Sequence, residues 1–305
     1  MSSRHRSMTW FCALIVLTLT AAACGGGSDT EKAAGGTKIL IGSFRFTESE
    51  TLAQIYGGAL KNAGADVGYR LGLGNREVVG PAIESGEIDL VPEYVGNYLA
   101  FLDKNQTNGL PLAEAVAKTK ALAKAKRLTV GAASSAADGD VLAVTKELAN
   151  SKGLTKISDL SKLDSVTLAG PTECETRQTC LLGLKTTYGL SNVTFLSTAD
   201  DAGGPITKKT LTEGKAQVGR LFSSDPDLAK AGKFVVLEDD KSYQQAGNVI
   251  PVLRTDKATE ALVKVLDKVS AALTNEKLLE LNKKTDVDKE DPAAAAAEFI
   301  RANKL

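Results

Sequence analysis

Short apolar runs alternate with helical patterns along the first third of the chain. Residues 38–43 form an apolar run that ends in a glycine turn, and residues 47–63 carry apolar side chains at helical spacing. Thr47 is the expected N-cap of that helix, with Glu50 three positions later. The pattern continues with strands at 66–71 and 88–91 and with helices at 76–85, from Glu93 onward, and at 112–124. This alternation predicts βαβ units and a largely parallel sheet.

The alternation restarts after a break at 132–140. It predicts strands at 141–144, 166–169, 193–196 and 218–222, and helices at 180–188 and 205–213. Beyond Lys257 the pattern is helical, and it ends in a helix at 292–302 for which Pro292 suits the first turn. Two α/β blocks followed by a helical tail predict a protein of two lobes, with the tail returning to the first lobe.

The N-terminus has the pattern of a lipoprotein export signal. Arg4 and Arg6 precede an apolar run at 14–19, and small residues lead to Cys24. The run is too short for a membrane span of about 20 residues. We therefore predict that residues 1–23 are removed, that Cys24 carries the lipid anchor, and that residues 24–36 form a flexible tether. The alternative is an ordinary secretory cleavage that leaves Cys24 unmodified.

Removal of the signal also changes which functions are chemically available. It deletes His5, Trp10 and both methionines, so the mature chain has no His, Trp or Met. Histidine is the commonest general base and metal ligand, so its loss argues against a hydrolytic triad and against a zinc site. We expect a binding protein, not an enzyme, with no cofactor and no metal.

Composition and charge indicate a folded and nearly neutral body. Hydrophobic residues make up 43% of the sequence and charged residues 24%. The chain has 37 bases and 37 acids, and loss of Arg4 and Arg6 leaves 35 bases. Such a balance attracts neither nucleic acid nor anionic lipid, and we expect a monomer.

Only two cysteines remain for cross-linking in the exported chain, Cys174 and Cys180. A pair in an oxidising compartment favours a disulfide over a metal site, with free thiols as the alternative.

Several stretches, taken in order, resemble the substrate-binding proteins of ABC importers for glycine betaine, choline and carnitine. These stretches are Ile-Gly-Ser at 41–43 with Phe-Thr-Glu at 46–48, GEIDLVPEYVG at 86–96, GPTE at 170–173 with Arg177, Gly-Leu-Lys at 183–185, DAGGP at 201–205, FSSDP at 222–226, VLEDDK at 236–241 and NVIP at 248–251.

The resemblance implies an α/β, type II periplasmic-binding fold with a ligand cleft between two lobes. Lobe I would comprise residues 37–133 plus 247–305, and lobe II residues 134–246. The protein would be held by its lipid anchor on the extracytoplasmic face of the cell membrane. There it would capture a compatible solute, a quaternary ammonium compound, and deliver it to an ABC permease.

A quaternary ammonium has no hydrogen-bond donor and is held by aromatic faces, at about 0.5 to 2 kcal/mol per ring. Without tryptophan, those rings are Tyr or Phe. Tyr94 falls on the family's box tyrosine, and Phe46 and Phe222 lie in matching motifs. Tyr243, near the second crossing, and Tyr98, one helical turn after Tyr94, are weaker candidates. The alternative for each ring is a place in the core.

The polar candidates come from the same resemblance. Arg177 matches the arginine that grips the ligand carboxylate in family members, and a planar guanidinium suits that contact; its alternative is a surface charge. Glu173, Asp138 and Asp140 are possible partners of a ligand cation, or turn-capping acids. Asn97 takes the position of a family threonine and could donate to a ligand oxygen.

Two positions depart from the family pattern. Gly247 stands where many members carry a tyrosine, and Phe44 where many carry a lysine. A full tyrosine cage is therefore absent, and choline, glycine betaine, carnitine, another compatible solute, or an aromatic or polyol ligand all remain open. A structural or signalling lipoprotein is the alternative outside transport.

Overall fold

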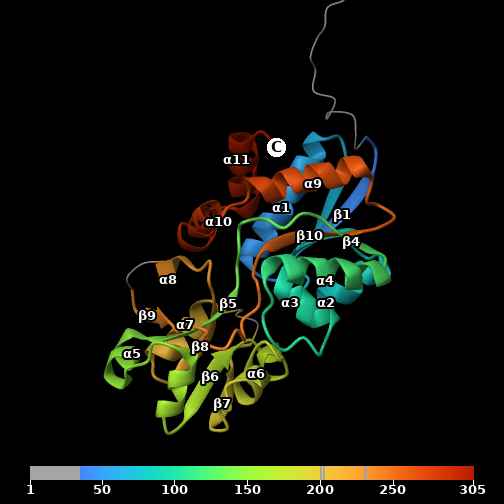
Figure 1. Ribbon diagram of the computed structural model, residues 1–305. Coiled ribbons are helices and arrows are strands. Elements are labelled where there is room, and N and C mark those ends of the chain that lie inside the picture. Colours follow the sequence, from blue (N-terminus) through green and yellow to red (C-terminus); the bar gives the residue numbers. More distant parts are fainter. Residues whose placement is uncertain (1–34, 200, 202, 230–231) are drawn as a thin grey trace, which may run out of the picture.

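The computed structural model describes residues 35–199, 201, 203–229 and 232–305, which form two α/β lobes joined by two crossing segments (Figure 1). Each lobe is built on one five-stranded sheet. The predicted signal peptide, the anchor Cys24 and nearly all of the tether lie outside the described residues. Within the described part of the chain, no helix is long and apolar enough to cross a membrane.

The sheet of lobe I has the strand order β2-β1-β3-β10-β4. Its strands are β1 (Lys38–Gly42), β2 (Asp66–Arg70), β3 (Leu90–Tyr94), β4 (Leu128–Val130) and β10 (Val249–Arg254). β1 is parallel to β2 and β3, whereas β10 is antiparallel to β3 and β4. The sheet is therefore largely parallel, as expected, but β10, for which no strand was predicted, runs antiparallel to its neighbours. This strand enters from the other lobe instead of following a crossover helix, so it runs in the opposite direction.

Helices cover both sides of this sheet. They are α1 (Thr47–Asn62), α2 (Arg76–Ser85), α3 (Val95–Leu102), α4 (Leu112–Ala125), α9 (Glu260–Ala272), α10 (Asn275–Asn282), the π-helical turn η3 (Lys283–Val287) and α11 (Pro292–Asn303).

Two expected helix starts in lobe I were wrong. Thr47 is the first residue of α1, whereas Phe46 occupies the N-cap without a side-chain cap. Glu93 belongs to β3, because the strand continues to Tyr94 and the next helix begins only at Val95.

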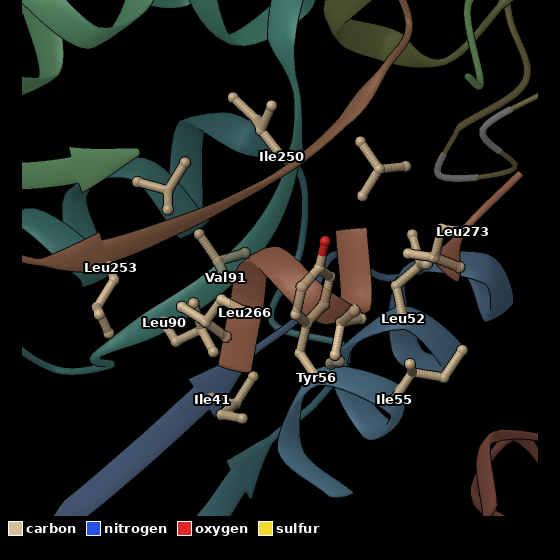
Figure 2. Packing of buried hydrophobic residues seen from close by; sticks show 14 of the residues in the cluster. Ile41, Leu52, Ile55, Tyr56, Leu90, Val91, Ile250, Leu253, Leu266 and Leu273 are labelled. Carbon is tan, nitrogen blue, oxygen red and sulfur yellow. The ribbon is translucent and has the colours of Figure 1, made fainter. Parts of the chain in front are cut away.

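The core of lobe I lies between α1 and the sheet. Leu52, Ile55 and Tyr56 of α1 are fully buried, in the same cluster as Leu90 of β3 and Leu266 of α9 (Figure 2). The Tyr56 hydroxyl hydrogen-bonds the Ser270 hydroxyl of α9 at 2.9 Å, which satisfies the one polar group of that ring. The last helix, α11, packs on α1, so the tail returns to the first lobe as predicted.

The sheet of lobe II has the order β7-β6-β8-β5-β9. β6 is parallel to β7 and β8, and β5 is antiparallel to β8 and β9. The strands are β5 (Asp140–Thr145), β6 (Val166–Gly170), β7 (Val193–Ser197), β8 (Val218–Phe222) and β9 (Phe234–Val236), and the helical segments are α5 (Lys146–Lys152), η1 (Ile157–Lys162), η2 (Thr172–Glu175), α6 (Leu181–Thr186), α7 (Pro205–Thr212) and α8 (Pro226–Ala229).

The two crossing segments lie side by side between the lobes. The Asp138 amide donates to the Gly247 carbonyl at 2.9 Å, and Ala137 pairs with Asn248 in an isolated antiparallel bridge. A Cβ atom on Gly247 would collide with the backbone of Asp138 and Gly139. The close approach of the crossings therefore leaves no room for a side chain at position 247.

Candidate functional site

A cavity of about 160 Å³ lies between the lobes, and we call it the aromatic cavity. Lobe I contributes the loop after β1, the start of α2 and the junction of β3 with α3, whereas lobe II contributes the loop after β6 and the end of β8. The lining residues are Phe44, Arg45, Phe46, Gly74, Asn75, Arg76, Val78, Tyr94, Asn97, Pro171, Glu173, Arg177, Arg220 and Phe222.

Aromatic rings from both lobes meet in the wall of this cavity. The Phe46 ring centroid lies 5.8 Å from that of Phe44, 6.2 Å from that of Tyr94 and 5.6 Å from that of Phe222. Three of these rings stand on lobe I, and Phe222 ends β8 of lobe II. The departure at Phe44 therefore adds an aromatic ring to the wall, a gain that the family pattern alone did not indicate.

Two buried guanidinium groups stack on these rings. The Arg76 guanidinium lies 5.0 Å from the Phe44 centroid, and the Arg220 guanidinium lies 4.2 Å from that of Phe222. Arg76 is paired with Glu93 at 2.8 Å, and Arg220 is paired with Asp140. Neither arginine was predicted from the sequence as a site residue. The available signal was the place of Arg220 in an otherwise apolar strand, where a buried charge requires a partner.

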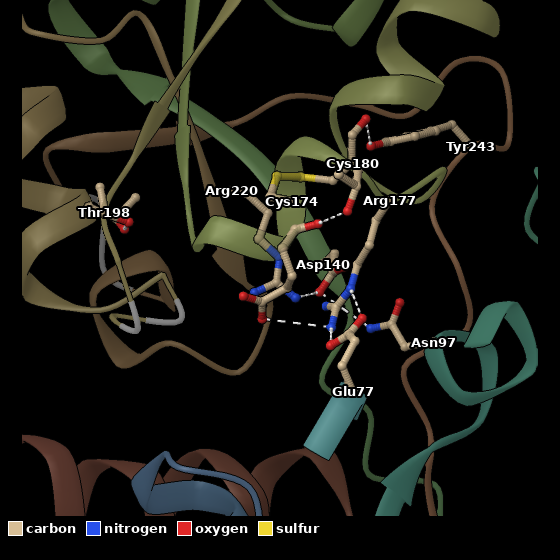
Figure 3. Close-up of a disulfide and its surroundings, with 12 residues drawn as sticks. Glu77, Asn97, Asp140, Cys174, Arg177, Cys180, Thr198, Arg220 and Tyr243 are labelled. Carbon is tan, nitrogen blue, oxygen red and sulfur yellow. Dashed lines mark hydrogen bonds and ion pairs between the residues drawn. A yellow bond between two sulfur atoms is a disulfide. The ribbon is translucent and has the colours of Figure 1, made fainter. Parts of the chain in front are cut away.

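Arg177 reaches across the cavity from lobe II to lobe I. Its Nε donates to Glu77 Oε1 at 3.1 Å and its Nη2 to Glu77 Oε2 at 2.6 Å, and Glu173 lies 3.7 Å from Nη2 (Figure 3). Although burial opposes ionisation, the hydrogen bonds and charge of Arg177 hold the pKa of the Glu77 carboxyl below its usual value. In this conformation the Arg177 guanidinium is therefore already paired with a carboxylate of the protein itself.

The loop that carries Arg177 is closed by a disulfide between Cys174 and Cys180, which confirms the predicted pairing. Both cysteines are buried. Tyr243 lies beneath the loop, where its hydroxyl donates to the Cys180 carbonyl at 2.7 Å and its ring meets the Tyr188 ring edge-on at 6.0 Å. Tyr243 supports the loop from behind and is therefore not among the residues that line the aromatic cavity.

The other predicted residues are divided between the cavity and its surroundings. Asn97 and Glu173 line the aromatic cavity. The Asn97 amide donates to Asp140 Oδ1 at 3.4 Å, so Asp140 is held by Asn97 of lobe I and by Arg220 of lobe II. Tyr98 is buried in lobe I beside Phe101, away from the cavity lining.

A second hollow adjoins the first, and we call it the acidic groove. It has a volume of about 850 Å³, and it shares Arg45, Phe46 and Phe222 with the aromatic cavity. Glu48 and Asp138 lie at its floor, both almost fully buried. The predicted ligand residue Asp138 therefore faces the groove and not the aromatic cavity.

A hydrogen-bond network surrounds Glu48 at the floor of the groove. The Tyr94 hydroxyl donates to Glu48 Oε1 at 2.6 Å, the Ser224 hydroxyl of lobe II donates to Oε2 at 2.8 Å, and the Asn282 amide also donates to Oε2. The Ser224 amide donates to Asp138 Oδ1 at 3.1 Å. Ser224 therefore links the two carboxylates and joins lobe II to lobe I.

Two α/β lobes around a small cavity define the class of two-lobed solute-binding proteins. In the described residues, no group of three or more His, Cys, Asp or Glu side chains is arranged to hold a metal ion. The family model for the substrate-binding domain of ABC-type glycine betaine transport systems matches residues 37–302, and the chain belongs to this family.

Similarity to known proteins supports the same family assignment. The glycine-betaine-binding protein of Pseudomonas aeruginosa is 27% identical over 283 residues, which cover 88% of each chain. The glycine betaine-binding protein YehZ of Escherichia coli is 26% identical; its apo structure aligns with a TM-score of 0.61 over 88% of this chain and 99% of the other. A glycine betaine/carnitine/choline ABC transporter structure, 21% identical, aligns with a TM-score of 0.68 over 87% and 98% of the two chains, which shows a shared fold.

Proposed function

We propose that this protein captures a quaternary ammonium compatible solute, such as choline, glycine betaine or carnitine, and delivers it to an ABC permease. The observation that carries the proposal is the aromatic wall formed by Phe46 and Tyr94 of lobe I and Phe222 of lobe II. The curated relatives from Pseudomonas aeruginosa and Escherichia coli, which bear the name of glycine betaine, support the same ligand class.

The size and chemistry of the cavity suit such a ligand. A cavity of about 150 Å³ holds a molecule the size of benzene, and the aromatic cavity measures about 160 Å³. Each aromatic face that contacts a methylated ammonium contributes about 0.5 to 2 kcal/mol. Because the rings come from both lobes, only the closed arrangement completes the contact set, so the ligand favours closure.

The carboxylate of glycine betaine or carnitine would bind Arg177, and it would compete there with Glu77. Choline has no carboxylate and leaves the Arg177–Glu77 pair intact. The chain therefore offers two ways to fill one cavity, with Glu77 as the group that a carboxylated ligand displaces. Glu173 and Asp140 would attract the ligand cation, and the Asn97 amide would donate to a ligand oxygen.

Anchoring and lobe organisation belong to the same proposal. Cys24 would hold the protein at the extracytoplasmic face of the membrane as a monomer, with lobe I at 37–133 plus 247–305 and lobe II at 134–246. It would bind and release its ligand without chemical turnover. Membrane-fraction protein should carry acyl mass on its N-terminal peptide, and Cys24→Ala should remove it; an unmodified and fully soluble wild-type protein would contradict the anchor.

The test of the ligand class is a calorimetric titration with choline, glycine betaine and carnitine. A polyol such as sorbitol and an aromatic acid serve as alternatives. Tyr94→Ala should weaken every quaternary ammonium ligand by at least tenfold, or about 1.4 kcal/mol. Tyr69→Phe, which removes only a hydroxyl outside the cavity lining, should leave affinity within twofold. If Tyr94→Ala binds as tightly as the wild type, or if only the polyol binds, the proposal is wrong.

A further inference from the structure

The floor of the acidic groove consists of hydrogen-bond acceptors. Glu48 of α1 is 4% exposed and Asp138 of the first crossing segment is 1% exposed. Their donors are Tyr94 and Asn282 of lobe I and Ser224 of lobe II. Two carboxylates so close to full burial are costly unless they are further compensated.

Asn282 presents an unsatisfied acceptor at the same place. Its Nδ2 donates to Glu48 and, at 3.3 Å, to the Ser224 carbonyl, and these two acceptors determine the orientation of the amide. Its Oδ1 is buried and has no hydrogen-bond partner. Asn282 is 2% exposed and lines the groove. A buried carbonyl oxygen without a donor is uncommon in folded proteins and indicates a missing partner.

Electrostatics at the floor favour a cation. Burial, together with the neighbouring charge of Asp286, raises the pKa of Glu48, and burial with the charges of Glu48 and Asp140 raises that of Asp138. A bound cation would stabilise the ionised forms of both carboxyls and thereby release protons.

Basic groups also face the groove. Lys208 of α7 is paired with Asp225 and Asp227 at 2.9 and 2.7 Å. The remaining charged groups at its wall are Arg45 before α1, Asp201 before α7, Lys209 of α7, Lys233 before β9, Asp286 of η3 and Lys289 after η3. These groups are exposed or partly exposed and belong to the rim, whereas the buried floor is made of the acceptors of Glu48, Asp138 and Asn282.

We propose that the floor of the acidic groove is a second binding subsite, for an alkylammonium group that carries N–H donors. Such a group would donate to Asn282 Oδ1 and to the carboxylates of Glu48 and Asp138. A quaternary ammonium has no N–H and cannot make these bonds, so the two hollows select different amines. The subsite goes beyond the quaternary ammonium site of the proposed function and is testable apart from it.

The experiment compares two small cations by isothermal titration at matched ionic strength. Ethylammonium chloride probes the acidic groove, and tetramethylammonium chloride probes the aromatic cavity. Titrations between pH 5 and 7, in two buffers of different ionisation enthalpy, measure the protons exchanged. We expect ethylammonium to bind with proton release, and tetramethylammonium to bind with less proton release.

Variants assign the subsite to its residues. Glu48→Gln keeps an acceptor oxygen but removes the charge, and should lower the affinity for ethylammonium relative to tetramethylammonium by at least tenfold. Glu260→Gln removes the same charge on the exposed side of α9, outside the residues that line the groove, and should change that ratio less than twofold. If circular dichroism shows that Glu48→Gln is unfolded, Asp138→Asn replaces it with the same expected result.

The outcomes separate the two proposals. If ethylammonium does not bind, binds without proton release, or keeps its relative affinity in the Gln variant, the subsite is refuted. If tetramethylammonium binds in those same experiments, the aromatic cavity and the proposed function stand. Failure of tetramethylammonium alone contradicts the proposed function and leaves the subsite supported.

Discussion

Two of the contacts that join the lobes across the cleft differ in almost every physical respect. Arg177 and Glu77 form one ion pair, with side chains 21% and 43% exposed. Glu48, Ser224 and Asn282 form a network in which the three residues are 4%, 8% and 2% exposed. Both bring lobe II to lobe I, but one is reached by water and the other is enclosed.

The difference indicates what each contact is suited for. An exposed ion pair contributes about 0 to 1 kcal/mol, so a ligand group can replace one partner at small cost. A buried network is costly to break, because each group left without a partner keeps its desolvation penalty. We therefore expect the Arg177 side of the cleft to exchange partners and the Glu48 side to hold its geometry.

The largest expected effect comes from breaking the buried contact. Glu48→Ala removes the acceptor for Tyr94, Ser224 and Asn282 and should lower the free energy of unfolding by about 3 kcal/mol. Chemical denaturation measures this change. A loss below about 0.5 kcal/mol, typical of surface substitutions, would contradict the contrast between the two contacts.

Glu48→Gln is the matched control, and the pH dependence of its stability makes the comparison with the wild type more specific. Because burial raises the pKa of Glu48 above its ordinary 4.5, the native state binds this proton more tightly than the unfolded state does. Stability from this group is therefore present below pH 4.5 and is lost as pH rises through the higher native value. The Gln variant should show a weaker loss over that range, and an equal or steeper loss would contradict the assignment.

The disulfide determines how well the exposed contact is held. Cys174 and Cys180 close a small ring around Arg177, and replacing both with serine should lower the free energy of unfolding by about 2 kcal/mol. The same variant should weaken a carboxylated ligand more than choline, because Arg177 loses its fixed position. Thiol titration of the wild type supplies the control, since free thiols at both positions would exclude the bond.

The ion pair itself is tested through ligand binding. Arg177→Ala should weaken glycine betaine or carnitine by at least tenfold, since a hydrogen bond to a charged group contributes about 1.5 to 3 kcal/mol. Choline should bind within threefold of wild type. Equal losses for choline and glycine betaine in calorimetric titration would show that Arg177 acts on lobe closure and not on the carboxylate.

The smallest expected effect belongs to Glu77. Glu77→Gln removes the competing charge and should change the free energy of unfolding by about 0.5 kcal/mol or less. It should strengthen binding of a carboxylated ligand about two- to fivefold, a gain of at most about 1 kcal/mol. Weaker binding of glycine betaine in this variant would mean that Glu77 orients Arg177 instead of competing for it.

The periodicity of the chain predicted most of the elements and the two-lobed α/β fold. Its errors lie where tertiary structure intervenes. The direction of β10 depends on its entry from the other lobe, and the strand that holds Glu93 is extended by its pairing with β10. Local pattern carries no information about either partner, because both contacts join residues far apart in the sequence.

Some residues of the site were predicted from the sequence and others were not, for a similar reason. Tyr94, Phe46 and Phe222 carry family motifs, and all three line the aromatic cavity. Tyr243 was a weaker candidate, and it lies behind the disulfide loop with its hydroxyl on the Cys180 carbonyl. Arg220 was not predicted, because its role depends on Asp140, which belongs to a different strand of the same sheet.

The sequence by itself determined the class of protein, the family, the disulfide partners and the absence of histidine from the body of the chain, because these depend on residue identity and order. Only the tertiary structure decided which charges meet. Arg177 faces Glu77, Arg220 faces Asp140, and Asn282 buries an oxygen without a hydrogen-bond partner beside Glu48. Electrostatic and hydrogen-bond energies depend on distances of a few ångströms and on burial, and both arise only when the two lobes and their crossings pack together.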